Sequence, residues 1–181
     1  MRRLFPALLL FALLGSLTQA GCSSNEVCHA GEPCECSGGH ECYVGCEGDG
    51  CNARCFQMEH CGAVCENDCS SQCFDVQECS TSCGDDCDVA CHNAVACGAI
   101  CGARCQFDCH DMQRCGVRAG EASEINCHNY TRCDVECSGT CHVRSDKACD
   151  EQQGCSVKCL GKAALTQCGD GSVACGACPA P

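Results

Sequence analysis

The sequence predicts an all-β protein, a parallel β-helix of roughly 18-residue coils with a disulfide-stapled interior. The first observation is composition: 31 of 181 residues are Cys, which indicates a disulfide scaffold. The second is an 18-residue repeat between Cys55 and Cys115, with Cys at unit positions 1, 7, 11 and 15. The third is the lack of a bulky core, since aromatics make up 4% and Trp is absent. Cystine must therefore fill much of the interior.

Each unit is interpreted as strands joined by turns. The cysteine positions are all odd, so a strand would direct them to one face. Positions 9 and 17, each between two cysteines, are mostly small or apolar, which gives the alternation of half-buried strands. Glu66-Asn67-Asp68 forms a turn between strands, and Asp or Asn at position 3 marks the other corner. The expected inward residues are Ala63, Thr81, Ala99, Val117, Val135 and Val157 at position 9, and Val89, Phe107, Ile125, Val143 and Leu165 at position 17.

A disulfide-rich helical repeat is the alternative fold. Eighteen residues also make five turns of α-helix, and the cysteines would then lie in a single stripe. Three features favour the β-helix: turn residues recur at fixed positions, Leu and Glu–Lys pairs are scarce, and an isolated helix would leave its cysteines unpaired.

The repeat divides the chain into short end segments and one cysteine-rich domain. We expect a signal peptide at 1–21, a lipidated tether at 22–27 and a single domain at 28–181. Within that domain, 28–35 is an N-terminal cap, 36–167 forms the coils and 168–181 is a C-terminal cap. Stacked ~4.8 Å apart, about eight coils would make a rod roughly 40 Å long. The units begin at Cys36, Cys55, Cys73, Cys91, Cys109, Cys127 and Cys149.

The cysteines are expected to pair across corners, position 1 with 7 and position 11 with 15. Inward cysteines four apart on one strand would be ~13 Å apart, beyond the ~7 Å Cα separation that a disulfide tolerates. In the Cys109 unit, positions 11 and 15 are Ala119 and Ser123, so both members of a pair are lost together. Bonds between stacked coils are the alternative.

This rule assigns a partner to 30 of the 31 cysteines and leaves Cys22 alone. The predicted pairs are Cys28 with Cys34, Cys36 with Cys42, Cys46 with Cys51, Cys55 with Cys61, Cys65 with Cys69, Cys73 with Cys79, Cys83 with Cys87, Cys91 with Cys97, Cys101 with Cys105, Cys109 with Cys115, Cys127 with Cys133, Cys137 with Cys141, Cys149 with Cys155, Cys159 with Cys168, and Cys175 with Cys178.

The N-terminal residues predict export. Arg2 and Arg3 precede the apolar run Leu4 to Leu14, which is too short to span a bilayer stably. Ala20-Gly21-Cys22 resembles the lipobox of bacterial lipoproteins, although Gln19 stands where Leu is preferred. Lipidation of Cys22 would also explain the odd number of cysteines, because the other 30 can all pair. The alternative is a soluble exported protein with one free or intermolecular thiol.

The net charge of the chain limits the classes of molecule that it could bind. The full chain carries −13, and loss of Arg2 and Arg3 with the leader leaves 9 basic against 24 acidic residues, or −15. A chain this acidic argues against nucleic acid and anionic lipid head groups as partners, because both need a basic surface. Cations and basic proteins remain possible partners.

Two ladders are candidate metal sites, each with a simpler interpretation. His92, His110 and His128 occupy position 2 of successive coils, so their imidazoles could bind Zn²⁺, or they could simply stack as the Phe side chains there would. Asp49, Asp68 and Asp86 form a second ladder that could bind Ca²⁺, or serve only as solvated turn residues. We favour the simpler interpretation of both, and therefore no obligatory cofactor.

No arrangement of residues indicates an active site. Cys175-Gly-Ala-Cys178 has the spacing of thiol oxidoreductases but lacks their βαβ context, so a structural disulfide is favoured. Coils of 18 residues leave little room for the loops that build a carboxylate-lined groove in polysaccharide-active β-helices. We therefore predict that the protein is not an enzyme.

The tandem C-x5-C-x3-C-x3-C-x3 units, from Cys36 to Cys159, resemble the cysteine-rich repeat proteins exported by bacteria such as the myxobacteria. The resemblance implies a cell-envelope lipoprotein, and Ser23 after Cys22 is compatible with sorting to the outer membrane. It supplies no catalytic residues. The expected function is a rigid surface scaffold or adhesion protein that binds an envelope protein or a glycan. The alternative is an exported protein that binds Ca²⁺ or Zn²⁺.

Overall fold

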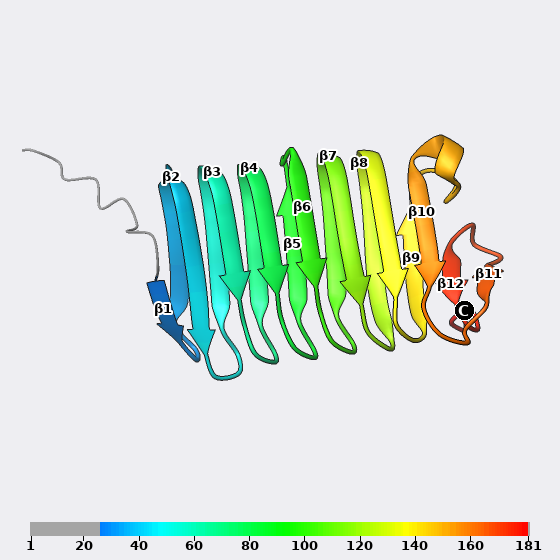
Figure 1. Cartoon of the computed structure of the whole chain (residues 1–181), viewed down its shortest axis with the longest axis horizontal. Coiled ribbons are helices and arrows are strands. Elements are labelled where there is room, and N and C mark those ends of the chain that lie inside the picture. The colour runs from blue at the N-terminus through cyan, green and yellow to red at the C-terminus, as the bar shows by residue number, and fades with distance from the viewer. Residues whose placement is uncertain (1–25, 181) are drawn as a thin grey trace, which may run out of the picture.

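A computed structural model describes residues 26–180 and confirms the predicted β-helix. The chain winds into about seven turns, roughly 18 residues apart, and forms no α-helix among these residues. Figure 1 shows the turns stacked side by side along the long axis, with β1 at one end and β11 and β12 at the other. The strands belong to one twelve-stranded sheet. They are β1 (Glu26–His29), β2 (Pro33–Glu47), β3 (Asn52–Val64), β4 (Ser70–Ser82), β5 (Asp88–His92), β6 (Ala96–Ile100), β7 (Gln106–Ala119), β8 (Ser123–Cys137), β9 (Cys141–Ser145), β10 (Cys155–Cys159), β11 (Leu165–Gln167) and β12 (Val173–Cys175).

Pairing is parallel from β1 through β10 and keeps equivalent unit positions in register. Cys55 lies beside Cys73, for example, and Cys109 beside Cys127. Five long strands run continuously around a corner of the coil: β2, β3, β4, β7 and β8. In the fourth coil the same path is divided into β5 and β6. Each unit position thus becomes a column that runs along the rod, which is why a repeat in sequence produces aligned side chains in space.

In the second to fifth coils, two corners depend on residues in the left-handed conformation. At position 3, Asp75 and Asn93 have φ values of 56° and 52°. At position 14, Asp68 and Asp86 have φ values of 55° and 58°. Asp and Asn tolerate this conformation better than most residues, which explains their recurrence at the corners.

The interior is built largely as the repeat predicts. The inward columns at positions 9 and 17 are confirmed in the central coils, where Phe107 and Ile125 are fully buried. Ser71 and Thr81 are the polar exceptions, and their hydroxyl groups hydrogen-bond to each other at 3.0 Å. A further inward column, at position 4, was not predicted. It contains Met58, Val76, Ala94, Met112 and Tyr130, all buried.

The corner geometry explains the missed column. A strict alternation from position 1 would direct positions 3 and 5 inward. The left-handed residue at position 3 turns the chain and interrupts that alternation, so position 4 is the next residue to face the interior. The cysteines at positions 1 and 7 then lie on either side of it.

The last coil has a different register from the predicted one. Cys127 lies beside Ser145 and Cys133 lies beside Cys155, so position 1 of this coil is Ser145 and not Cys149. The four additional residues form a widened corner between β9 and β10, which includes a short 3₁₀ turn at Glu151–Gln153. Leu165 does not lie beside Val143 at position 17, because Val173 of β12 pairs there, and the Leu165 side chain is half exposed.

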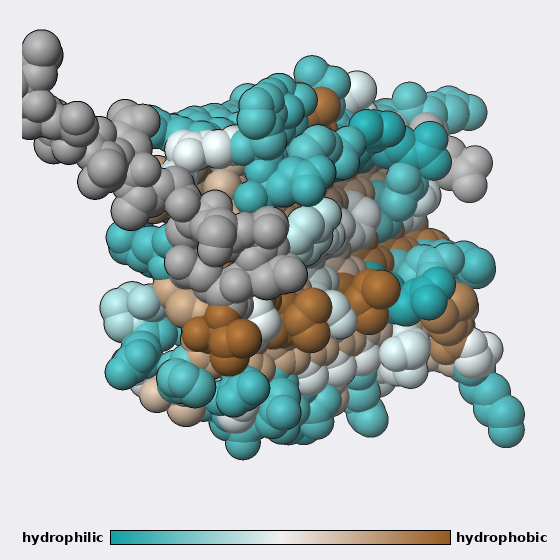
Figure 2. Space-filling model, turned by 60° about the vertical axis from the view of Figure 1, so that its left-hand side comes forward, coloured by the Kyte–Doolittle hydropathy of each residue, from teal (hydrophilic) through white to brown (hydrophobic). Residues whose placement is uncertain are grey.

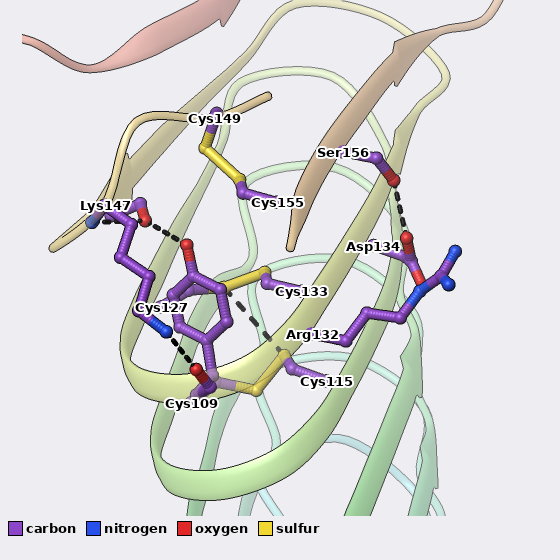
Figure 3. The surroundings of a disulfide bond; sticks show 12 residues. Cys109, Cys115, Cys127, Arg132, Cys133, Asp134, Lys147, Cys149, Cys155 and Ser156 are labelled. Carbon is purple, nitrogen blue, oxygen red and sulfur yellow. Dashed lines mark hydrogen bonds and ion pairs between the residues drawn. A yellow bond between two sulfur atoms is a disulfide. The ribbon is translucent and has the colours of Figure 1, made fainter. Parts of the chain in front are cut away.

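Side chains of neighbouring coils hold this widened corner in place. Figure 3 shows the Cys127–Cys133 disulfide next to Cys109–Cys115, with Cys149–Cys155 beyond. The buried Tyr130 hydroxyl hydrogen-bonds to the Ser145 hydroxyl. The Lys147 ammonium lies 4.4 Å from the Tyr130 ring centroid and donates to its carbonyl oxygen.

The C-terminal end closes the rod with antiparallel pairing. β12 pairs with β9, and β11 pairs with β12, so the last coil does not end on an open parallel edge. No helix in the part of the chain described is long and apolar enough to cross a membrane.

Candidate functional site

The main surface feature is a groove along one flat face of the rod, with a volume of about 960 Å³. Its centre is the straight strand segment at unit positions 6 to 10, where even positions point outward. Figure 2 shows large apolar side chains in a row along the rod, bordered by hydrophilic ones. We call this the groove face. Its exposed apolar side chains include Val27, Tyr43, Val64 and Ile100.

The floor of the groove is a column of small residues at position 8. Gly62, Ser80, Gly98 and Gly116 lie side by side in successive coils. A Cβ atom on Gly62 would come within 2.5 Å of the Tyr43 ring, so that glycine is needed for packing inside the chain. A Cβ atom on Gly116 would meet nothing within 4 Å, and one on Gly98 only a carbonyl oxygen at 3.9 Å. Nothing in the fold therefore requires glycine at these two strand positions, and a strand glycine often marks a place where another molecule approaches.

The flanking columns carry charge. Position 6 contributes Glu41, His60, Glu78 and Arg114 among others, and the far end of position 10 carries Arg118 beside Glu136. The Arg118 guanidinium donates to the Glu136 carboxylate at 2.6 Å. That contact and Lys158 hold the pKa of Glu136 below its ordinary value. The groove is thus apolar along its floor and charged at its borders.

The disulfides follow the predicted corner pairing wherever positions 1 and 7 of a coil both hold Cys, and also at both ends of the rod. Ten predicted bonds are confirmed among the residues described, and each joins two cysteines of one coil. They join Cys28 to Cys34, Cys36 to Cys42, Cys46 to Cys51, Cys55 to Cys61, Cys73 to Cys79, Cys91 to Cys97, Cys109 to Cys115, Cys127 to Cys133, Cys137 to Cys141, and Cys149 to Cys155.

The two disulfides predicted at the C-terminal end were wrong, because their cysteines bond to other partners. Cys159 bonds to Cys175 where Cys168 was expected, and Cys168 bonds to Cys178. The antiparallel pairing of β12 brings Cys175 to β10, which sequence spacing could not indicate. The C-x-x-C segment therefore forms two separate links.

Three further predicted bonds are absent: Cys65 with Cys69, Cys83 with Cys87, and Cys101 with Cys105. All six are thiols, at positions 11 and 15 of the three central coils. Each of these sulfur atoms lies close to a sulfur atom of a neighbouring coil or to a carbonyl oxygen of its own corner. The Cys65 and Cys46 sulfurs are 3.6 Å apart, and the sulfurs of Cys83, Cys101 and Cys105 all lie within 4.8 Å of one another. The Cys87 thiol lies against the carbonyl oxygens of its own corner.

The six thiols at positions 11 and 15, which we call the thiol column, influence one another's pKa values. Burial raises the pKa of Cys65 to about 12, with the neighbouring Cys69 adding to the effect. Hydrogen bonds from the Cys101 and Cys83 thiols lower the pKa of Cys105 to about 3. Three close sulfur atoms are also ligands that soft metal ions prefer. The sequence did not indicate that these six cysteines are thiols, because their spacing is the same as that of cysteines that form disulfides.

The predicted acidic ladder does not form as one column. The additional residue of the first unit places Asp49 beside Asn67, whose amide nitrogen atoms hydrogen-bond to the Asp49 carboxylate at 3.1 Å. Asp68 and Asp86 belong to the adjacent column, at position 14. The Arg104 guanidinium then binds Asp86 at 2.6 and 2.7 Å and lowers the pKa of that carboxyl. The predicted ladder is therefore corrected: Asp49 lies outside it, whereas Asp68 and Asp86 occupy the same corner position of neighbouring coils.

The histidine ladder does form as a column. The His92 and His110 ring centroids are 5.4 Å apart, and those of His110 and His128 are 6.5 Å apart. The rings are tilted by 51° and 57°, and His110 also lies 2.9 Å from the Asp111 carboxylate. In the same column Phe56 and Phe74 stack at 5.2 Å, consistent with simple ring packing. Zn²⁺ binding by these imidazoles stays a prediction.

One polar chain at the C-terminal end was not predicted. The buried His142 ring hydrogen-bonds through Nε2 to the Ser172 hydroxyl, which donates to Asp170. Serine stands between the other two, whereas a catalytic triad has histidine in the middle. The arrangement fastens β12 to β9 and offers no activated nucleophile.

Comparison with protein-family models, curated proteins and solved structures finds no match for this chain. The resemblance to exported cysteine-rich bacterial proteins therefore stays an expectation. The signal peptide at 1–21 and the lipidation site Cys22 lie outside the described residues.

Proposed function

We propose that the protein is a non-enzymatic, lipid-anchored scaffold of a bacterial cell envelope, and that the groove face binds another component of that envelope. The observation that carries this proposal is the groove itself, because an apolar hollow on so acidic a chain is unusual on a surface without a partner. Disulfides in nearly every coil support a rigid, extended binding surface in an oxidising compartment.

The lining of the groove favours a protein over a glycan. Sugars need hydrogen-bonding side chains, whereas Val64 and Ile100 offer only apolar contacts. An added β-strand would also find no open edge, because β4, β6 and β7 already pair with one another across this face. A partner must therefore present side chains that enter the hollow.

The anchor is tested by replacing Cys22 in the full-length chain. We expect the wild-type protein to remain with the membrane fraction and to have an intact mass that begins at a triacylated Cys22. Cys22→Ser should appear in the soluble fraction or the medium. A wild-type chain that begins at Gly21 without lipid would overturn the anchor, and the protein would then be a released one.

The binding face is tested by photo-crosslinking in intact cells. A photoreactive amino acid at the exposed Ser80, on the groove floor, should form an adduct with a defined envelope protein. The matched control carries the same group at Asp88, an exposed position on a different face of the coil. Equal adducts at both positions, or none at Ser80, would contradict a binding role for the groove.

A further inference from the structure

We infer that the groove face binds a second copy of this chain, in an antiparallel arrangement about a two-fold axis that passes through the coil of Ser80 and Ser82. This inference rests on the proposed function of the groove as a binding site and names the partner. The axis lies in the interface, perpendicular to the rod, so the first coil of one copy meets the fifth coil of the other.

The outward columns are self-complementary about this axis. Position 8 reads Tyr43, Gly62, Ser80, Gly98 and Gly116 in successive coils. The exposed Tyr43 ring, which lies over Gly62, would therefore face Gly98 and Gly116 of the other copy. Those are the two glycines whose outward space is open, so the ring has a hollow to enter.

The next column repeats the match with apolar side chains. Position 10 reads Val64, Ser82 and Ile100 in the second, third and fourth coils. Val64 is 63% exposed and Ile100 is 56% exposed. The two-fold axis places each of them against the other in the second copy, and Ser82 against itself. These two exposed apolar side chains would thus cover each other.

Charge complementarity fixes the antiparallel direction. At position 6, Glu41 lies in the first coil and Arg114 in the fifth, and both are exposed. Neither has an ion-pair partner among residues 26–180. The axis brings Glu41 of each copy to Arg114 of the other, which gives two symmetric ion pairs at the border. The one contact between like charges would be between Glu78 of one copy and Glu78 of the other. In each copy, His60 lies 3.3 Å from that carboxylate.

The test is sedimentation velocity of the purified full-length chain that carries Cys22→Ser, so that neither lipid nor that thiol drives association. We expect a reversible, concentration-dependent dimer. Glu41→Arg and Arg114→Glu should each raise the dimer Kd at least about tenfold, and the double variant should restore it because the pair is reversed. Ile100→Glu should leave a monomer, and Asp88→Arg, on a different face, should leave the dimer unchanged.

The outcomes separate this inference from the proposed function. A monomer at every concentration, or a dimer that the Glu41 and Arg114 variants leave unchanged, would overturn self-association. So would failure of the double variant to restore the dimer while its circular dichroism remains native. If Ser80 still crosslinks to a different envelope protein in those cases, the scaffold function stands. A dimer without any envelope retention would overturn the scaffold function instead.

Discussion

Reduction with dithiothreitol is expected to abolish most of the β-sheet circular dichroism of the protein at room temperature. Twelve disulfides link the residues described, and most close loops of only four to six residues. The chain-entropy model gives about 2 kcal/mol for a loop of this size. Even without full additivity, their sum exceeds the net stability of an ordinary domain, about 5–15 kcal/mol. A far-UV spectrum before and after reduction measures the effect.

Thiol counting controls this experiment. Alkylation of unreduced, unfolded protein should add six groups, at the thiols of the three central coils, besides any at Cys22. Alkylation after reduction should modify every cysteine. An unchanged spectrum after complete reduction would show that buried apolar columns alone hold the coils, and would contradict the role given to the disulfides.

Phe107→Ala is expected to cost about 3–5 kcal/mol in the free energy of unfolding, the range for removing a buried aromatic side chain. Phe107 has a relative exposure of 1% and is the largest of the fully buried side chains. It stands between Val89 and Ile125 in the position 17 column, so the cavity would extend across three coils. Denaturant unfolding of the oxidised protein measures the loss.

Phe56→Ala is the matched control, because Phe56 is the same residue type at an outward corner. It stacks on Phe74 with ring centroids 5.2 Å apart. Such a pair contributes about 0.5–1.5 kcal/mol beyond burial, so this change should cost much less than Phe107→Ala. Equal losses for the two variants would mean that position 17 does not form the core.

The sequence was sufficient for the fold class because the repeat imposes it. Cysteines at odd unit positions, apolar residues at position 9 and Asp or Asn at the corners all favour stacked strands over a helical repeat. Residues such as Asp75 then adopt the left-handed conformation that their identity suggests. Local preference and global architecture agree in the central coils, which is the condition under which a pattern can be interpreted reliably.

The candidate site was not predicted, because its residues share no pattern within a unit. Position 8 holds Tyr43, Ser80 and Gly116, which look unrelated until the coils are stacked and the column becomes a groove. The thiol column was missed for a similar reason, since the bonded and unbonded corners have the same spacing. Both features depend on distances between coils.

By itself, the sequence determined the coil length, the inward columns at positions 9 and 17, and ten of the disulfides, because each depends on residues close together in one coil. Only the tertiary structure decided the rest. It placed Ser145 where Cys149 was expected, because four residues widen one corner, and it bonded Cys159 to Cys175, because the terminal strands pair antiparallel. It also separated Asp49 from Asp68, because one additional residue shifts the register. These are contacts between coils, and a spacing counted along the chain does not contain them.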